Sequence, residues 1–354
     1  MTKERKIRVG ISIGDLNGIG SEVILKTFED PRMLDFCTPV IFASIKTLVF
    51  LKKHFSSACN LQGIDKLEDI EEDKVNVYNI WKEHVDISFG QEDVKIGEFA
   101  IQSLQAATTA LKIDEIDVLV TAPINKKSIQ SEDFKFPGHT DYLNQELEGD
   151  SLMLMVSEGL KVGLLTDHVA VKDIAATITP KLIKQKTATI YRSLIMDFGI
   201  PRPKIAVLGI NPHSGDNGVI GKEDETILKP TIAEINKGGR LIYGPYAADS
   251  FFGSSNYQAF DAVVAAYHDQ GLIPFKTLSF GEGVNYTAGL NKVRTSPDHG
   301  TAFEIAGKGT ADEGSFKEAV FLAIKIFKNR ELHEELTANP LKRQPRKTYT
   351  KDRF

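Results

Sequence analysis

The chain has 354 residues, too many for one ordinary core, which predicts two domains or one large domain with an insertion. Hydrophobic residues make up 42% and charged residues 26%, values of a globular rather than a disordered protein. The net charge of -5 is small for this length and gives no general basis for binding nucleic acid or an anionic membrane.

The start of the chain, its cysteines and its last residues predict a soluble cytoplasmic protein. The first residues pass from a charged head into a strand pattern, without the apolar stretch of a signal peptide, and no run approaches the ~18 apolar residues of a membrane span. Cys37 and Cys59 form neither a CxxC pair nor a disulfide framework, which suits a reducing compartment. Residues 341–354 are basic and predict a solvated tail.

Strand-like and helix-like segments alternate along the chain. The β-branched runs that predict strands are 6–13, 38–44, 74–80, 116–122, 160–166, 204–210 and 261–267. Segments 97–112 and 180–199 carry apolar residues at helical spacing. This alternation predicts an α/β fold with a mostly parallel sheet and helices on both faces. Binding sites in such folds lie beyond the carboxyl ends of strands, and polar clusters follow several of these runs.

The first of these clusters is rich in glycine. Gly14, Gly18 and Gly20 lie between a predicted strand and a predicted helix, with Ser21 as a candidate N-cap. Backbone N–H groups at such a turn can hold an anion, but a tight βα connection explains the glycines equally well. Their spacing differs from the GxGxxG dinucleotide fingerprint, and no Walker motif occurs, which disfavours a nucleotide phosphotransferase.

Three histidines share one position, just past a predicted strand: His168, His213 and His268. Neutral imidazole is a common metal ligand, and three of them with an open position can polarise a substrate oxygen. The alternative is that each histidine is satisfied or functional by itself.

Other candidates for ligand binding lie in glycine-containing loops. Lys276 and Arg294 near strand ends could clamp a phosphate or carboxylate, although a single lysine is usually solvated. His139 precedes a predicted helix, where it could equally be exposed beside a cap formed by Thr140 or Asp141.

Motifs in one order cover nearly the whole chain: GDLNGIGSEV, TAPINK, FPGHTDYL, NPHSGDNGVIGKEDE, GPYAADSFF, YHDQGLIPFK, GVNYTAGL and RTSPDHGTAFEIAGKGTADEGSF. Together they resemble the 4-hydroxythreonine-4-phosphate dehydrogenase family, enzymes of pyridoxal phosphate (vitamin B6) biosynthesis. The resemblance implies two α/β/α domains around a cleft, as in isocitrate and isopropylmalate dehydrogenases. The first domain would comprise 1–130 and 290–354 and the second 131–289. A homodimer would share its active sites between subunits.

The resemblance also implies the residues of the site. A divalent metal would be held by His168, His213 and His268 from both subunits, with Zn²⁺ favoured over Co²⁺, Mn²⁺ or Mg²⁺. The family's substrate contacts fall on His139, Thr140, Lys276, Asn285 and Arg294. Segment 298–309 looks like an NAD loop, with coenzyme contacts at His299, Gly300, Thr301 and Ala302. NADP is the alternative coenzyme, and a structural glycine-rich turn is the alternative role for the loop.

The implied reaction oxidises 4-phosphooxy-L-threonine with NAD to a 3-keto acid, which decarboxylates to 3-amino-2-oxopropyl phosphate. Asp249 and Asp269 are both candidates for proton relay or for support of the imidazoles. Two departures from the family pattern could alter substrate fit: GDLNGIG replaces GEPAGIG, and Asn125 stands where some members carry histidine. The alternatives are a dehydrogenase of another phosphorylated hydroxyacid (phosphothreonate or phosphoerythronate), a phosphate acyltransferase, and a non-catalytic binding protein.

Overall fold

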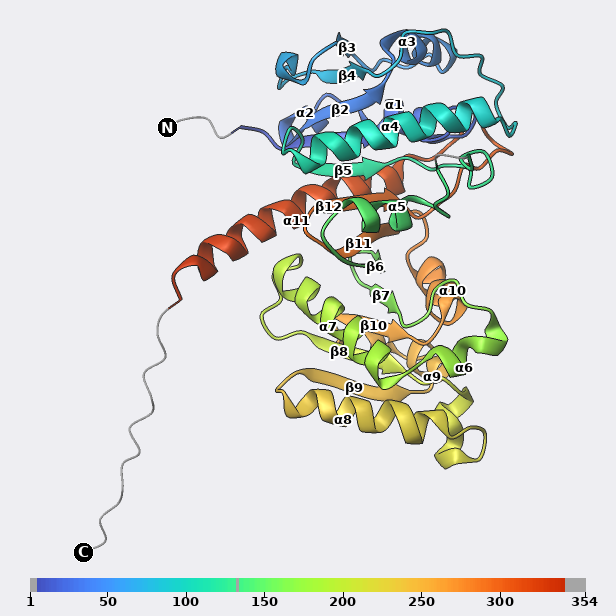
Figure 1. Cartoon of the computed structure of the whole chain (residues 1–354), viewed down its shortest axis with the longest axis vertical. Coiled ribbons are helices and arrows are strands. Elements are labelled where there is room, and N and C mark those ends of the chain that lie inside the picture. Colours follow the sequence, from blue (N-terminus) through green and yellow to red (C-terminus); the bar gives the residue numbers. More distant parts are fainter. Residues whose placement is uncertain (1–4, 132–133, 341–354) are drawn as a thin grey trace, which may run out of the picture.

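The computed structural model describes residues 5–131 and 134–340, so the predicted basic tail, 341–354, lies outside the described residues. Its strands form one sheet in the order β3-β4-β2-β1-β5-β12-β11-β6-β7-β10-β8-β9 (Figure 1). The strands are β1 (Arg8–Ser12), β2 (Thr38–Ala43), β3 (Leu61–Ile64), β4 (Val75–Asn79), β5 (Val118–Thr121), β6 (Gly149–Val156), β7 (Lys161–Leu164), β8 (Lys204–Leu208), β9 (Leu241–Tyr246), β10 (Ala262–Ala265), β11 (Val284–Leu290) and β12 (Val293–Pro297). The helices are α1 (Gly20–Thr27), α2 (Met33–Phe36), α3 (Ile45–His54), α4 (Val94–Lys112), α5 (His139–Glu146), α6 (Ile174–Thr177), α7 (Pro180–Met196), α8 (Lys229–Lys237), α9 (Ala248–Phe252), α10 (His268–Leu278) and α11 (Gly314–Ala338).

Two parallel blocks make up this sheet, and an antiparallel joint connects them. From β3 to β12 the neighbouring strands pair in parallel, as do β7, β10, β8 and β9. Between the blocks, β11 pairs antiparallel with β12 and β6, and β6 pairs antiparallel with β7. The chain therefore leaves the first block after β5 and returns to it through β11 and β12.

Each block is buried on both faces, as expected for parallel strands made of apolar residues. In β5, Val118 and Val120 join a core with α1 and α11, whereas Leu119 packs on the other face with α4. In the second block, α7 and α8 cover the face of Val207 and Val264, and α9 and α10 cover the opposite face. The predicted architecture of two α/β/α halves is confirmed, and the predicted domain boundaries stay predictions.

All seven predicted strands and both predicted helices are present, with small differences at their ends. Asp93 caps α4 by accepting two backbone N–H groups, and the hydroxyl of Thr179 accepts one at the start of α7. The prediction that Ser21 caps α1 is wrong. The helix begins at Gly20, which packs closely against the backbone oxygen of Ile13, so Ser21 lies inside the first turn with its hydroxyl unpaired.

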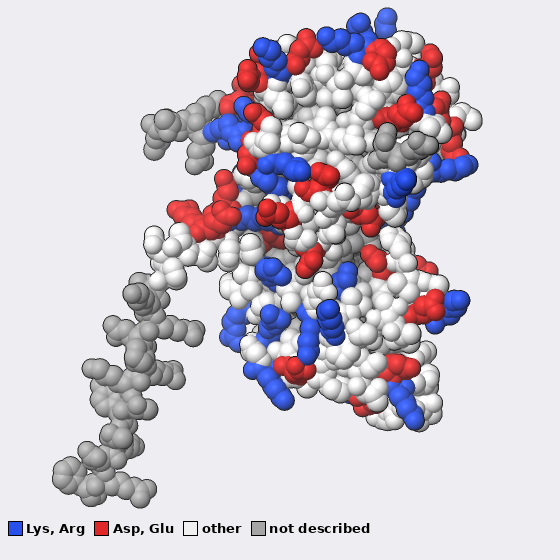
Figure 2. All heavy atoms as spheres, viewed as in Figure 1, with Lys and Arg blue, Asp and Glu red and all other residues white. Residues whose placement is uncertain are grey.

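The surface carries both signs of charge. Acidic and basic side chains are interspersed over most of the face in Figure 2, in keeping with the small net charge of -5. In the same view the molecule narrows between its two halves. No helix within residues 5–131 and 134–340 combines the length and hydropathy needed to cross a membrane.

Candidate active site

A pocket of about 570 Å³ lies between the two halves, and the joint where β12, β11 and β6 run side by side forms its floor. The pairing register places Ser296, Asn285 and Met155 in one row across these strands. Because side chains alternate between the faces of a sheet, Arg294 and Met153, two residues away, line the same pocket. The antiparallel joint thus brings residues that are distant in sequence onto one surface.

Arg294 is a buried cation in this floor, with 2% of its surface exposed. Its guanidinium donates to the hydroxyl of Thr121 through Nε (3.2 Å) and Nη2 (2.6 Å), and to the hydroxyl of Thr287 through Nη1 (3.0 Å). Among the described residues no carboxylate forms an ion pair with it. Burial lowers the pKa of Arg294 to about 9, so the group stays charged near neutral pH. A buried cation held only by hydroxyls can be compensated by an anionic ligand.

Helix α10 supplies the wall on the side of the second half. His268, Leu272 and Lys276 are spaced by four residues, so they lie on one face of the helix, and all three line the pocket. Lys276 Nζ donates to the backbone oxygen of Asp298 at 2.9 Å, which links α10 to the loop after β12. This lysine therefore lies at the junction of two walls.

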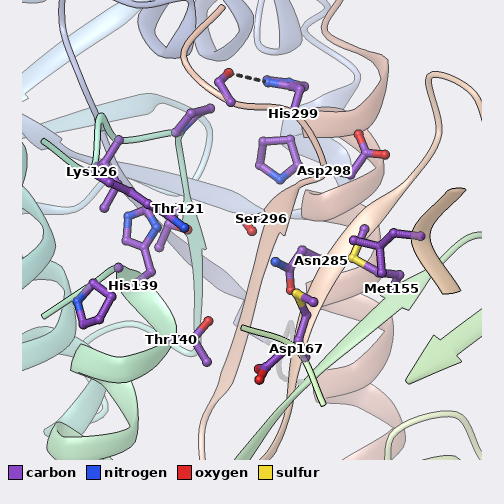
Figure 3. Close-up of a pocket in the computed structure, with 18 of the residues that line it drawn as sticks. Thr121, Lys126, His139, Thr140, Met155, Asp167, Asn285, Ser296, Asp298 and His299 are labelled. Atoms are coloured by element: carbon purple, nitrogen blue, oxygen red, sulfur yellow. Dashed lines mark hydrogen bonds between the residues drawn. The ribbon is translucent and has the colours of Figure 1, made fainter. Parts of the chain in front are cut away.

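The opposite wall is the start of α5, with His139 and Thr140 (Figure 3). The cap roles considered for Thr140 and Asp141 are wrong, because Gly138 is the N-cap and both residues lie within the first turn. Burial, and then the charges of Arg294 and Lys126, hold the pKa of His139 well below its usual value. The imidazole is therefore neutral at physiological pH.

Three polar atoms at the pocket are buried without a hydrogen-bond partner: His139 Nε2, Asn285 Oδ1 and His299 Nε2. Leaving such a group unpaired costs about 1–3 kcal/mol, so three at one site indicate a ligand that pairs with them. Figure 3 shows His139 on one side, Asn285 on the other and His299 above. The charged residues that line the pocket are Lys126, Lys276, Arg294, Asp141, Asp167 and Asp298.

Two of the three predicted metal ligands meet in this pocket. The rings of His168, which follows β7, and His268, the first residue of α10, have centroids 6.4 Å apart. His213 lies on an exposed turn after β8 and does not line the pocket. Within the described residues of one chain, no group of three or more His, Cys, Asp or Glu side chains could hold a metal ion. The His168 and His268 rings fit two ligands of a metal, and the triad stays a prediction.

The turn that carries His213, Pro212–Gly218, has an uncommon backbone. Its five residues from 213 to 217 have φ values between 43° and 81°, and only one of them is glycine. The left-handed conformation costs about 1–2 kcal/mol for each non-glycine residue. Asp224, which is fully buried, opposes this cost by accepting hydrogen bonds from the backbone of Ile210 and from the backbone and side chain of Asn211. Strain of this kind occurs mainly at functional sites.

The polar residues at the start of α10 differ in their contacts. Asp269 Oδ1 lies 2.7 Å from His268 Nδ1, a contact that orients the imidazole. The side chain of Gln270 bonds a backbone N–H after β10 and a backbone oxygen after β8, so it fastens the ends of these two strands together. Sequence reasoning gave Gln270 no role. Asp249 lies in α9 and does not line the pocket.

The predicted coenzyme segment lies partly at the pocket. His299 and Gly300 line it, whereas Thr301 and Ala302 do not. His299 Nδ1 lies 3.1 Å from the backbone oxygen of Gly300, the dashed line in Figure 3. Ala302 has a φ of 45°, so this loop also contains a strained residue.

Sequence reasoning missed these pocket residues: Thr121, Lys126, Met155, Asp167, Ser296 and Asp298. A signal existed for three of them. Thr121 and Lys126 belong to TAPINK and Asp167 precedes His168, in polar clusters that follow predicted strands. Met155 had none, because β6 was not predicted.

Comparisons with known proteins agree with the motifs. The family model for the pyridoxal phosphate biosynthetic protein PdxA matches residues 35–323. A 4-hydroxythreonine-4-phosphate dehydrogenase of Bacteroides thetaiotaomicron is 47% identical over 97% of this chain and 94% of its own length. A D-threonate 4-phosphate dehydrogenase of Cupriavidus necator is 36% identical over 88% of this chain and 95% of its own. The solved 4-hydroxythreonine-4-phosphate dehydrogenase of Klebsiella pneumoniae superimposes with a TM-score of 0.80, at 32% identity over 92% of this chain and 99% of its own.

Proposed function

The chain belongs to the family of the pyridoxal phosphate biosynthetic protein PdxA, and we propose that it is an NAD-dependent dehydrogenase of 4-phosphooxy-L-threonine. The observation that carries the proposal is the buried guanidinium of Arg294, which has no carboxylate partner among the described residues. Lys126 and Lys276 add positive charge at the same pocket. The proposed substrate carries a phosphate, a carboxylate and an amino group, which match the cations and carboxylates that line the pocket.

Five residues would bind and orient this substrate. Arg294 and Lys276 would hold its anionic groups, because a guanidinium can form two parallel hydrogen bonds and Lys276 extends from the neighbouring wall. The remaining contacts would come from His139, Thr140 and Asn285. Binding would pair the buried Nε2 of His139 and the buried Oδ1 of Asn285. Fixing the substrate between opposite walls limits it to one orientation for reaction.

The reaction oxidises the C3 alcohol. The hydrogen on C3 leaves as hydride to the nicotinamide ring of NAD, the hydroxyl proton goes to a base, and a C3 ketone forms. The resulting 3-keto acid then loses its carboxylate as CO₂ and yields 3-amino-2-oxopropyl phosphate. The coenzyme, NAD before NADP, would lie along His299, Gly300, Thr301 and Ala302. Asp269 remains a candidate for supporting proton transfer through His268, whereas Asp249, outside the pocket, has less support.

A divalent metal and a second copy of the chain belong to the same proposal. His168 and His268 of one copy and His213 of the other would hold Zn²⁺, or less favourably Co²⁺, Mn²⁺ or Mg²⁺. When bound, the metal supplies a Lewis acid that makes the substrate hydroxyl more acidic. The exposed, strained turn that carries His213 supports its use by a partner. A cytoplasmic location stays a prediction too, supported by two buried cysteines without a disulfide.

The experiment that tests the activity is NADH formation by the purified full chain with 4-phosphooxy-L-threonine and NAD. Shared sites are tested with His213→Ala and His268→Ala, produced separately and then co-expressed. Each variant alone should be inactive, and mixed dimers should regain activity because one of their two sites is intact. His84→Ala, at an exposed histidine, is the matched control. Absence of NADH formation by the unaltered protein would refute the activity, and dimers without restored activity would refute shared sites.

D-Threonate 4-phosphate is the second candidate substrate, because a relative is named for it. The two candidates differ at C2, where one carries an amino group and the other a hydroxyl. The carboxylates of Asp141 and Asp167 at the pocket favour the cationic amino group. A higher kcat/KM with D-threonate 4-phosphate than with the phosphorylated amino acid would reverse this assignment. The names of the relatives favour either dehydrogenase over a phosphate acyltransferase.

A further inference from the structure

The segment from Gly14 to Lys26 contacts the segments that form two walls of the pocket. At one end, the N–H of Asp15 donates to the backbone oxygen of Pro123 at 2.8 Å, and a Cβ on Gly14 would lie 2.3 Å from that oxygen. A few residues on, a Cβ on Gly18 would lie 2.9 Å from the backbone oxygen of Thr301. The glycines therefore serve close packing between backbones, which decides between the two roles that the sequence left open.

Helix α1 continues this contact along the proposed coenzyme loop. Glu22 is 0% exposed, and its Oε1 accepts the N–H of Ala311 at 2.7 Å and pairs with Lys26 Nζ at 2.9 Å. Lys26 Nζ also donates to the backbone oxygens of Gly309 (3.0 Å) and Ala311 (2.6 Å). One ion pair within α1 thus bonds the loop three times, on both sides of its last turn.

Other segments hold the loop between these bonds and the pocket. The N–H of Ile19 donates to the oxygen of Thr301 at 3.0 Å, and His54 Nε2 lies 2.9 Å from the oxygen of Gly307. A Cβ on Gly90 would meet the oxygen of Phe303 at 2.8 Å. The loop is therefore anchored along its length behind its two pocket residues. Fixing a loop in its binding conformation raises affinity because less ordering is needed on binding.

We propose that the Glu22–Lys26 pair is a positioning element for the dinucleotide coenzyme. The pair holds residues 299–311 in the conformation that receives the coenzyme, and it touches neither the reacting atoms nor the substrate. This inference rests on the proposed assignment of 299–302 to NAD. A buried ion pair adds little net stability compared with an apolar replacement, so its three bonds to the loop matter mainly for geometry.

The test uses the full chain with two variants. Lys26→Met removes every bond of the ammonium but leaves the Glu22 carboxylate buried and unpaired, which risks unfolding. The double variant Glu22→Gln/Lys26→Met removes both charges and keeps an amide oxygen for the N–H of Ala311. Either variant should raise the Kd of NADH, followed by nicotinamide fluorescence, and the KM of NAD by tenfold or more, while the KM of the phosphorylated substrate stays within threefold. Lys229→Met, which breaks a comparable exposed pair with Glu225, should change neither.

Amide hydrogen exchange of residues 299–311 separates this inference from the proposed function. Faster exchange in the double variant than in the Lys229→Met control supports the positioning role. Unchanged exchange overturns it, as does an unchanged Kd of NADH or an equal rise in both KM values. If the unaltered chain binds no NADH, the coenzyme assignment fails, and the clause on coenzyme binding is overturned with it.

Discussion

Two buried arginines of this protein should respond in opposite ways to the same substitution. Arg294→Met removes the cation of the pocket, and Arg330→Met removes a cation that bonds Asp197 Oδ1 at 2.7 Å and the hydroxyl of Tyr286 at 3.0 Å. The Asp197 side chain is only 3% exposed, so losing Arg330 leaves a buried carboxylate unpaired. Arg294 leaves behind only two threonine hydroxyls.

The expected magnitudes follow from these surroundings. Burial lowers the pKa of Arg294 from 12.5 to about 9, a penalty on the charged form of about 5 kcal/mol. Its removal offsets the loss of three hydrogen bonds worth about 1.5–3 kcal/mol each, so the free energy of unfolding should change little. Breaking the Arg330 pair should cost about 3–5 kcal/mol and lower the Tm by on the order of 5–10 °C.

Substrate binding should show the reverse order. An anion held by Arg294 through two charge-assisted hydrogen bonds loses about 3–6 kcal/mol in Arg294→Met, a fall in kcat/KM of about 10²–10⁴. Arg330→Met should leave the KM of the folded fraction within threefold. The assays are thermal unfolding without ligand and initial rates of NADH formation at a temperature where both variants are folded. If Arg294→Met lowers the Tm as much as Arg330→Met, or leaves kcat/KM unchanged, Arg294 is a structural residue and the anion site is wrong.

Three further predictions concern protons, thiols and metal. The pKa of His139 is lowered below 6.5, so the folded state binds fewer protons than the unfolded state and stability should fall as pH drops below about 6.5. The loss of Tm between about pH 7.5 and pH 5.5 should be smaller in His139→Gln, and an equal loss would contradict the buried neutral imidazole. Burial raises the pKa of the Cys37 and Cys59 thiols to about 12, so neither should react with a thiol reagent until the protein unfolds; rapid labelling of the native protein would be the contrary result. A chelator should abolish NADH formation but spare NADH binding, with activity restored by Zn²⁺; full activity in chelator would remove the metal from the proposal.

The parallel blocks could be predicted from sequence, whereas the joint between them could not. Strands such as β5 are buried on both faces and read as short apolar runs. β12 is equally buried but contains Arg294, Thr295 and Ser296, because its side chains meet a pocket and a hydroxyl network instead of a core. β6 and β11 pair with partners far along the chain, and local composition carries no trace of such partners.

The candidate site shows the same division. The position past a strand end correctly brought His168 and His268 to one pocket. Nothing local to Asn285 shows that it lies opposite Ser296, because that proximity depends on the register of two strands that were not recognised. Resemblance to a family supplied what local pattern lacked, and the register of the joint now gives the physical reason.

The pairing of β5 with β12 has a consequence for how the chain is made. Val118 pairs with Val293, and about half of the chain lies between them. During synthesis β5 therefore emerges early as an apolar edge strand whose partner does not yet exist. Forming so distant a pair requires closing a long loop, which slows folding and lengthens exposure to aggregation. Completion of the first half, and of the pocket floor with it, must wait until translation has passed Pro297.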